Sequence, residues 1–262
     1  MNNSVSQCVR LIREAGTIAA LTGAGISTKA GIPDFRGPNG LYVTRRYDPD
    51  KVFDIDYFHK DPSLFYQFAR DFILLAEKIK PTFAHKFLSD LEKAGKCKGV
   101  ITQNIDSLHQ MAWSKNVYEM HGSFWVSRCL KCGKEFSFAQ MKQKLAVEEI
   151  PRCACGGAIK PDVVFFGENV KYLAESEHLA SRADLFFVIG TSCVVYPAAM
   201  IPQYVQGKII VVNRDPVSLP LMNIALHVRE DIDAFFTKVA EEFRRNFHEP
   251  HKSGVRTQPG NS

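Results

Sequence analysis

Four of the seven cysteines form two close pairs, a pattern that can bind a metal ion. Cys129 and Cys132 are separated by two residues, Cys153 and Cys155 by one, and twenty residues lie between the pairs. Four thiolates can surround Zn²⁺ tetrahedrally and leave no open position, which is typical of a structural site. The pattern therefore predicts one structural zinc ion per chain. The alternative is four unrelated buried thiols.

A glycine-rich turn follows the short apolar run 17–22 and could approach a phosphate group. Gly23 and Gly25 stand at this turn, and the helix expected to follow would offer free N–H groups and the positive end of its dipole. Ser27 and Thr28 stand where the third glycine of the dinucleotide fingerprint or its neighbour is expected, so the fingerprint is incomplete. The turn indicates either a pyrophosphate site or merely a tight connection between a strand and a helix.

Three further polar residues lie where strands are expected to end. Asn104 and Asp106 follow the apolar run 99–102, and His121 follows the segment 116–120. Because side chains at the carboxyl ends of parallel strands point into the ligand crevice of an open sheet, the three could share one pocket. A histidine there can act as a general base on a hydroxyl group, or it can be only a structural hydrogen-bonding group.

These residues must be positioned by alternating strands and helices. Short apolar runs predict buried strands at 17–22, 99–102, 184–189 and 208–212. The spacing of apolar residues predicts a first helix that stops before Gly16 and further helices at 61–78, 82–95, 196–204 and 231–245. We therefore expect an α/β protein with a doubly wound parallel sheet.

Three segments depart from this alternation. The region 128–159 is bounded by the cysteine pairs and contains one amphipathic stretch, 138–145, so it predicts a small inserted module. The segment 31–49 is rich in Gly, Pro, Asn and Arg and predicts a long loop, which in compact domains is often functional. The apolar segment 160–169 is either a core strand with a turn or an edge to which a peptide could add as a strand.

Composition and charge exclude several classes of protein. With 45% hydrophobic and 23% charged residues, the 262-residue chain is globular rather than disordered. The net charge of +5 is not a nucleic-acid footprint, because residues 244–262 hold +3 of it and zinc-bound thiolates would remove 2 more. Residues 247–262 have almost no apolar side chains and are predicted to be disordered.

The sequence also predicts where the protein resides. The N-terminal stretch is interrupted by charged residues, so it lacks the apolar core of an export signal. The most apolar window, 183–201, is interrupted by Gly190 and Pro197. We therefore expect a cytoplasmic protein without a membrane span, in which Cys8, Cys97 and Cys193 are free thiols.

Taken together, these motifs resemble the sirtuin family of NAD-dependent protein-lysine deacylases, in its bacterial and archaeal form that consists of little more than the catalytic core. The resemblance extends from about residue 5 to 243. It rests on the two cysteine pairs and on the stretches 23–42, 102–109, 119–123, 160–169, 190–198 and 211–215.

The resemblance implies a Rossmann-like doubly wound parallel sheet with a small inserted zinc-ribbon and helical module. The catalytic core would span residues 1–246, with a large domain from about 1–30, 82–124 and 160–246. The small module would combine the helical and loop part 31–81 with the zinc ribbon 125–159.

The same resemblance implies the residues of the site. His121, Asn104 and Asp106 would be catalytic. The residues expected to bind NAD are Gly23, Ala24, Gly25, Thr28, Asp34, Phe35, Arg36, Gln103, Asn104, Ile105, Asp106, His121, Gly190, Thr191, Ser192, Asn213, Arg214, Asp231 and Ile232. The residues expected to hold the substrate peptide as an added strand are Val164, Phe166, Gly167, Glu168, Val194, Val195 and Tyr196.

The activity implied by the family is NAD-dependent deacetylation of protein lysine. NAD would be consumed, nicotinamide released, and the acetyl group transferred to ADP-ribose, with His121 taking a proton from a ribose hydroxyl. Some members that remove acidic acyl groups have a Tyr and an Arg three residues apart. Here Tyr66 and Arg70 are four apart, which favours an apolar acyl group. Ser107 and Cys193 replace a common Gly and a common Leu.

Other functions remain as alternatives. Within the family these are mono-ADP-ribosyl transfer and removal of longer acyl chains. A zinc-ribbon protein that binds nucleic acid would show concentrated basic residues around the cysteines, but Glu135, Glu148 and Glu149 dilute them. A hydride-transferring dehydrogenase would show the complete dinucleotide fingerprint. We therefore expect acetyl-lysine peptides as partners and no direct binding to nucleic acid or membranes.

Overall fold

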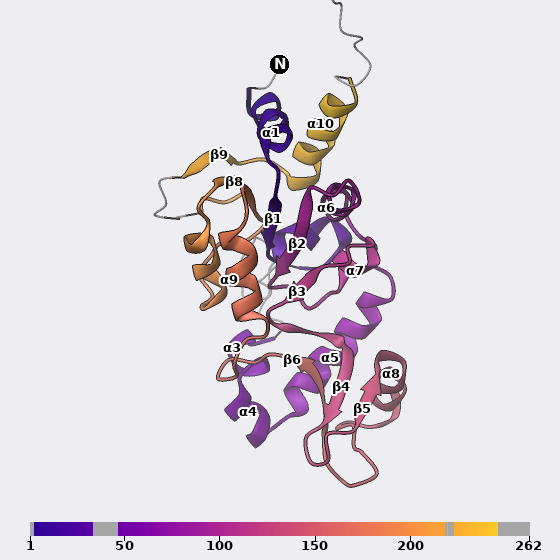
Figure 1. Ribbon diagram of the computed structural model, residues 1–262. Coiled ribbons are helices and arrows are strands. Elements are labelled where there is room, and N and C mark those ends of the chain that lie inside the picture. Colours follow the sequence, from indigo (N-terminus) through magenta and orange to yellow (C-terminus); the bar gives the residue numbers. More distant parts are fainter. Residues whose placement is uncertain (1–2, 34–46, 218, 220–222, 246–262) are drawn as a thin grey trace, which may run out of the picture.

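A six-stranded parallel sheet forms the larger part of the computed structural model, which describes residues 3–33, 47–217, 219 and 223–245. The strands are β1 (Ile18–Thr22), β2 (Cys97–Thr102), β3 (Val117–Glu119), β7 (Leu185–Ile189), β8 (Lys208–Val212) and β9 (Ile224–Val228). Their order is β3-β2-β1-β7-β8-β9, and every neighbouring pair is parallel (Figure 1). The chain moves outward from β1 on one side and from β7 on the other, so the topological switch point lies between these two strands.

The four predicted strands are confirmed to within two residues at each end. They are readable because β1 and β7 are buried at all five positions, as expected for central strands that are covered on both faces. One face packs against α1 (Asn3–Glu14), α6 (Phe83–Lys93) and α10 (Ile232–Arg245). The other face packs against α9 (Leu173–Ser181) and the 3₁₀ helix η2 (Ala198–Tyr204). The predicted Rossmann-like doubly wound sheet is therefore present.

Two predicted helices have a tighter form than an α-helix. The segment after the glycine-rich turn is a seven-residue 3₁₀ helix, η1 (Ala24–Ala30), and the predicted helix 196–204 is η2. Pro202 lies inside η2, where it has no N–H to donate, which disfavours a regular α-helix. The remaining helices within the described residues are α3 (Pro49–Val52), α4 (Ile55–Lys60), α5 (Ser63–Ala76), α7 (Leu108–Met111) and α8 (Phe138–Val147).

A second, three-stranded antiparallel sheet forms a smaller unit at the lower end of Figure 1. Its strands are β4 (Gly122–Cys129), β5 (Glu135–Ser137) and β6 (Ile159–Val163), in the order β5-β4-β6. The predicted amphipathic stretch forms α8, whose N-terminus is capped by the side chain of Ser137. The core of this unit is rich in aromatic rings, among them Phe65, Phe68, Phe72, Phe124 and Phe165.

Two predicted segments lie largely or wholly outside the described residues. Most of the loop 31–49 and all of the tail 247–262 lie outside the described residues, and so do three predicted NAD-binding residues, Asp34, Phe35 and Arg36. Within the described ranges, none of the helices combines the length and apolar character that a membrane crossing requires.

Candidate active site

The loops after β1 and β7 touch backbone to backbone at the switch point. The N–H of Gly25 donates to the carbonyl of Gly190 at 2.8 Å. A Cβ on Gly25 would lie 2.7 Å from the Cα of Gly190, and a Cβ on Gly190 would lie 2.4 Å from the backbone nitrogen of Ile26. Gly190 also has a φ of +62°, a conformation that side chains disfavour. The close contact between the two loops therefore explains why glycine is needed at both positions, without reference to a ligand.

A pocket beside this contact gathers six of the predicted NAD-binding residues. It is lined by Gly25, Thr28, Asn213, Arg214, Asp231 and Ile232, together with Ile26, Lys29, Asp215, Glu230 and Asp233. We refer to it as the Asp231 pocket. The last five residues were not among the predicted ones, because only the fold brings the segments 25–29, 213–215 and 230–233 together.

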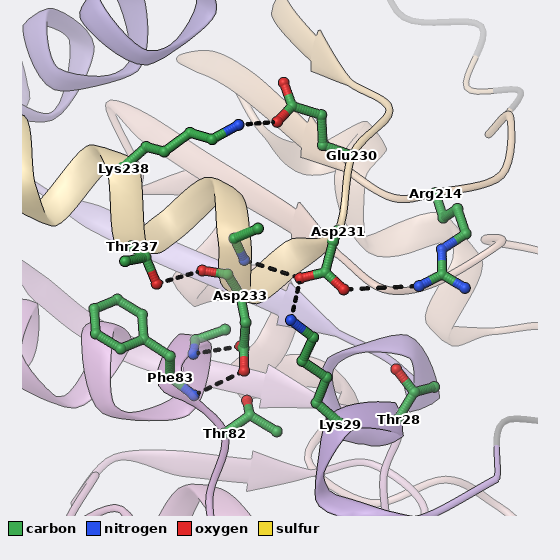
Figure 2. Close-up of polar contacts among 12 residues, drawn as sticks. Thr28, Lys29, Thr82, Phe83, Arg214, Glu230, Asp231, Asp233, Thr237 and Lys238 are labelled. Carbon is green, nitrogen blue, oxygen red and sulfur yellow. Dashed lines mark hydrogen bonds and ion pairs between the residues drawn. The ribbon is translucent and has the colours of Figure 1, made fainter.

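Asp231 organises the charges of this pocket (Figure 2). Its carboxylate pairs with Lys29 at 2.7 Å and with Arg214 at 3.7 Å. It also accepts the N–H of Ala234 at the start of α10. Burial alone would raise the pKa of Asp231, but these partners outweigh it and lower the pKa below its ordinary value. The pocket therefore presents an ionised carboxylate that is already neutralised by two cations.

Two of the predicted catalytic residues lie in one buried network. The side-chain amide of Asn104 donates to the hydroxyl of Ser27 at 3.1 Å and to the carbonyl of Gly23 at 3.2 Å. The Ser27 hydroxyl donates to Asp106 at 2.6 Å, and the other oxygen of Asp106 accepts the N–H of Leu108 at 2.9 Å. Burial raises the pKa of Asp106 against the lowering effect of these hydrogen bonds. The network fixes the loop after β2 to η1.

His121 has the geometry and the charge state of a general base. Its Nδ1 lies 2.8 Å from the carbonyl oxygen of Gln103, which can only accept, so Nδ1 carries the proton and Nε2 has the free lone pair. Burial lowers the pKa of His121, although the bond to Gln103 acts in the opposite direction. The Gln103 side chain donates to the hydroxyl of Thr191 at 3.0 Å. Three predicted residues from three loops are thereby joined around a neutral imidazole.

Gly122, which follows His121, is required by close packing. Its φ is +69°, and a Cβ there would lie 1.8 Å from the carbonyl oxygen of Asp162. The carbonyl of His121 itself accepts the N–H of Val164 at 2.8 Å. The candidate base is therefore attached directly to the predicted peptide-binding segment.

Several backbone groups of the predicted peptide-binding segment are already hydrogen bonded within the protein. The N–H of Phe166 donates to Phe53, and its carbonyl accepts from Ile55, so its backbone is used within the protein. One carboxylate oxygen of Glu168 accepts from the N–H of Phe165 at 2.8 Å and from Lys160 at 2.9 Å. Glu168 thus shapes the turn.

The remaining predicted residues include three exposed apolar ones. Val194, Phe166 and Tyr196 are 44%, 49% and 69% exposed, which leaves apolar surface available to a peptide. The carbonyl of Val195 accepts the N–H of Ala199 at the start of η2. Ile105 packs against the aromatic core of the small unit. Ala24 begins η1, and Ser192 is exposed beside Thr191.

The four paired cysteines form one cluster in the small unit. Their Sγ atoms all lie within 4.8 Å of one another, with 3.4 Å between Cys129 and Cys155 and 3.7 Å between Cys132 and Cys153. Zn–S bonds of about 2.3 Å in a tetrahedron separate sulfur atoms by roughly 3.8 Å, far more than the about 2.05 Å of a disulfide. A Cβ on Gly157 would lie 2.7 Å from the Sγ of Cys129, so glycine keeps space beside this sulfur. The donor set fits a structural zinc ion.

The comparisons with known proteins agree with this arrangement. The model of the Sir2 family matches residues 23–197, which include η1, the His121 centre and the four cysteines. The chain belongs to the Sir2 family. A protein of Thermotoga maritima named NAD-dependent protein deacetylase is 44% identical over 239 residues, which cover 88% of this chain and 95% of that protein. A protein of the same name from Sulfurisphaera tokodaii is 45% identical over 227 residues, which cover 85% of this chain and 89% of that protein.

Solved Sir2 structures share the fold of this chain. A Sir2 complex with a p53 peptide and NAD⁺ has a TM-score of 0.84 and 40% identity, covering 92% of this chain and 99% of that one. A Sir2 variant with a deacetylated p53 peptide and 3′-O-acetyl ADP ribose has a TM-score of 0.85 and 41% identity, covering 91% and 98%. The predicted family and fold are confirmed.

Two departures of this Sir2 chain from the common pattern adopt unusual backbone conformations. Ser107 has a φ of 56° at the start of α7, a region where glycine has no steric penalty. Its hydroxyl donates to Glu119 at 3.1 Å. Cys193 has a φ of 52°, and burial raises the pKa of its thiol to about 11. Cys193 is therefore a protonated thiol at neutral pH.

Proposed function

We propose that this Sir2 chain is an NAD-dependent protein-lysine deacetylase that transfers the acetyl group of acetyl-lysine to ADP-ribose and releases nicotinamide. The observation that carries the proposal is the neutral imidazole of His121, with Nε2 free and its own carbonyl bound to Val164. The base thus lies between the predicted NAD residues and the predicted peptide segment. The relatives named NAD-dependent protein deacetylase support the same activity.

NAD would enter this arrangement as a substrate that is cleaved between nicotinamide and ribose. We assign the adenosine half to the Asp231 pocket and the phosphates to the backbone of the loops after β1 and β7. Asn104 and Asp106, which Ser27 holds in place, would face the nicotinamide half. Holding both substrates in a reactive arrangement can supply about 7–11 kcal/mol of the barrier.

The proton transfer falls to His121. After the amide oxygen of acetyl-lysine has displaced nicotinamide from the ribose carbon, Nε2 would accept the proton of a ribose hydroxyl, while Gln103 holds the proton on Nδ1. That hydroxyl would then attack the acyl carbon, and water would complete the transfer as lysine leaves with a free amine. Because burial lowers the pKa of His121, the imidazole is available as a base at neutral pH. Phe35 and the apolar residues of the peptide-binding segment would keep water out until the last step.

Zinc would be held by the four clustered thiolates and would serve a structural role. Its coordination would join the two cysteine loops, with no position left for a substrate. We also propose the domain division stated from the sequence, with 31–81 and 125–159 in the small module, and a cytoplasmic location.

We propose acetyl, or another small apolar acyl group, as the group that is removed. Arg70 donates from Nε to the carbonyl of Leu145 and from Nη2 to the carbonyls of Glu148 and Glu149. Tyr66 is buried and donates its hydroxyl to the carbonyl of Ile159 at 3.0 Å. Both side chains are therefore committed to the fold and are not available to bind an acidic acyl group.

An acetyl-lysine peptide, incubated with and without NAD and followed by mass, tests the function. We expect loss of the acetyl mass only with NAD, and a decrease of at least about 100-fold in a His121→Ala variant. The matched control is His178→Ala, because His178 lies on the exposed side of α9. Equal acetyl loss without NAD, or full activity of His121→Ala, contradicts the proposal. A gain of ADP-ribose mass on a non-acetylated peptide would favour mono-ADP-ribosyl transfer instead.

A further inference from the structure

A buried lysine, Lys160, lies directly behind the turn that faces the peptide site. It belongs to β6, and its side chain is only 7% exposed. Burying an ammonium group destabilises the folded protein unless acceptors bind its N–H donors. The groups that contact Lys160 therefore indicate its role.

The hydrogen bonds and the ring contact of this ammonium group are all made to the turn formed by residues 163–168. Lys160 donates to the carbonyl of Val163 at 2.6 Å and to the carboxylate of Glu168 at 2.9 Å, and its Nζ lies 4.0 Å from the centre of the Phe165 ring. Such a cation over an aromatic face is attractive. Burial lowers the pKa of Lys160, and the charge and hydrogen bond of Glu168 oppose this shift.

The strand itself does not depend on this cation. β6 pairs with β4 through Ile159, Lys160 and Pro161, opposite Cys129, Arg128 and Ser127. We expect this pairing to remain when the ammonium group is removed, because it is made by backbone groups. Glu168 is 33% exposed on its side chain, so its carboxylate can turn towards water when its partner is lost. The turn is therefore the part that loses order.

The turn is connected on both sides to functional groups. Near its start, the N–H of Val164 donates to the carbonyl of the candidate base His121 at 2.8 Å. Its last residues, Gly167 and Glu168, are predicted to pair with the peptide, and Gly167 has a φ of +93°. We propose that Lys160 is a positioning residue for the peptide, which closes the 163–168 turn through Glu168 and holds it in the conformation that accepts an added strand.

This proposal rests on the proposed function and gives a specific kinetic signature. If the turn is ordered only part of the time, peptide affinity falls by that fraction, while the bound complex reacts at its normal rate. We therefore expect Lys160→Met to raise the KM for acetyl-lysine peptide about tenfold, a loss of about 1.4 kcal/mol in binding. The kcat at saturating peptide and the KM for NAD should stay within about twofold of the wild type.

Two further variants separate positioning from general damage. Lys171→Met is the matched control, because Lys171 pairs with Asp162 on the same strand but outside the turn, and we expect it to leave the peptide KM unchanged. In a double-mutant cycle, Lys160→Met added to Glu168→Ala should raise the KM little further, since both act through one pair. Lys160→Arg, which keeps the charge, should recover most of the affinity.

Hydrogen exchange of the protein alone tests the order of the turn without any activity. In Lys160→Met, the amides of Phe165 and Glu168 should exchange about tenfold faster, whereas those of β4 should not change. Exchange and peptide KM both equal to the wild type would overturn the proposal, as would a fall in kcat at an unchanged peptide KM. If the wild-type protein fails to deacetylate but the turn loosens as expected, the proposed function fails and the structural role of Lys160 remains.

Discussion

The two sides of the His121 centre are held in place by different kinds of interaction. On the side of the parallel sheet, the loops are fixed by glycines in backbone contact and by buried hydrogen bonds, as at Gly25, Gly190 and Ser27. On the side of the small unit, the turn 163–168 holds a buried ion pair and packs into an aromatic core, and the same unit contains the thiol cluster. The first arrangement depends on shape, whereas the second depends on charge and on metal. Each side should therefore fail under different conditions.

The largest expected effect is the loss of zinc from the small unit. We expect Cys129→Ser to abolish zinc binding and deacetylation, because apparent binding free energies of about 10–16 kcal/mol support folding at structural zinc sites. Hydrogen exchange should show loss of protection in β4 and β6 while β1 and β7 remain protected. Cys8→Ala, at a buried thiol outside the cluster, is the control and should retain one zinc per chain. Protection lost equally in both sheets would show that the two regions are not distinct.

The next largest effect concerns the glycine contact. Gly25→Ala places a Cβ against the backbone of Gly190, so we expect a loss of about 3 kcal/mol in the free energy of unfolding. Gly31→Ala is the control, because Gly31 has a φ of +95° but no described atom lies within 4 Å of a Cβ placed there. It should cost only about 1 kcal/mol. Denaturant unfolding measures both, and equal costs would contradict the role given to the loop contact.

Acid should weaken the sheet side through a buried pair of histidines. His85 and His109 lie with ring centres 4.6 Å apart, and His109 Nε2 lies 2.9 Å from the Thr22 hydroxyl. Burial lowers the pKa of His109 to about 3 and that of His85 well below its ordinary value. Below pH 6.5 the unfolded chain therefore binds protons that the folded protein does not. The free energy of unfolding should thus decrease as the pH is lowered.

The His109→Gln variant measures this contribution. Gln can still reach the Thr22 hydroxyl but does not titrate. Between pH 6 and 4, the free energy of unfolding of the variant should decrease less steeply than that of the wild type. The difference between the two slopes should be about 1.4 kcal/mol per pH unit. The comparison of slopes removes the contribution of buried acids such as Asp106, whose raised pKa acts in the opposite direction. Identical slopes would mean that His109 does not stay neutral in the folded protein.

The smallest effect is expected at the ion pair of the Asp231 pocket. Lys29 and Asp231 are 52% and 29% exposed on their side chains, so water screens their attraction. Lys29→Met should lower the free energy of unfolding by less than about 1 kcal/mol, and high salt should remove the difference. A larger loss that persists in high salt would show that charge matters on the sheet side as well.

In the parallel sheet, the sequence predicted the strands whose burial is nearly complete and missed the partly buried strand β9. The central strands were readable as apolar runs, whereas β9, Ile224–Val228, has only its last residue fully buried and was not predicted. The segment 196–204 has helical spacing, but Pro202 makes it a 3₁₀ helix. Spacing within a motif carries no information about such local departures.

The site was predicted where motifs lie next to strand ends, and missed where the contact is long-range. Ser27 and Asp106 are hydrogen bonded across 79 positions of sequence, and Lys29 meets Asp231 from an even more distant segment. Lys160 stood in a recognised motif, but only the fold shows that its charge points into the turn. The roles of Asp34, Phe35 and Arg36 stay predictions.

The contact between Gly25 and Gly190 also limits how this protein can evolve. A side chain on either glycine meets the backbone of the other loop, so neither position can change alone without moving both loops. A descendant that bound another ligand in the same pocket would still inherit both glycines. In a newly sequenced relative, these two glycines therefore indicate that the loops share this packing. The ligand must be inferred from other side chains.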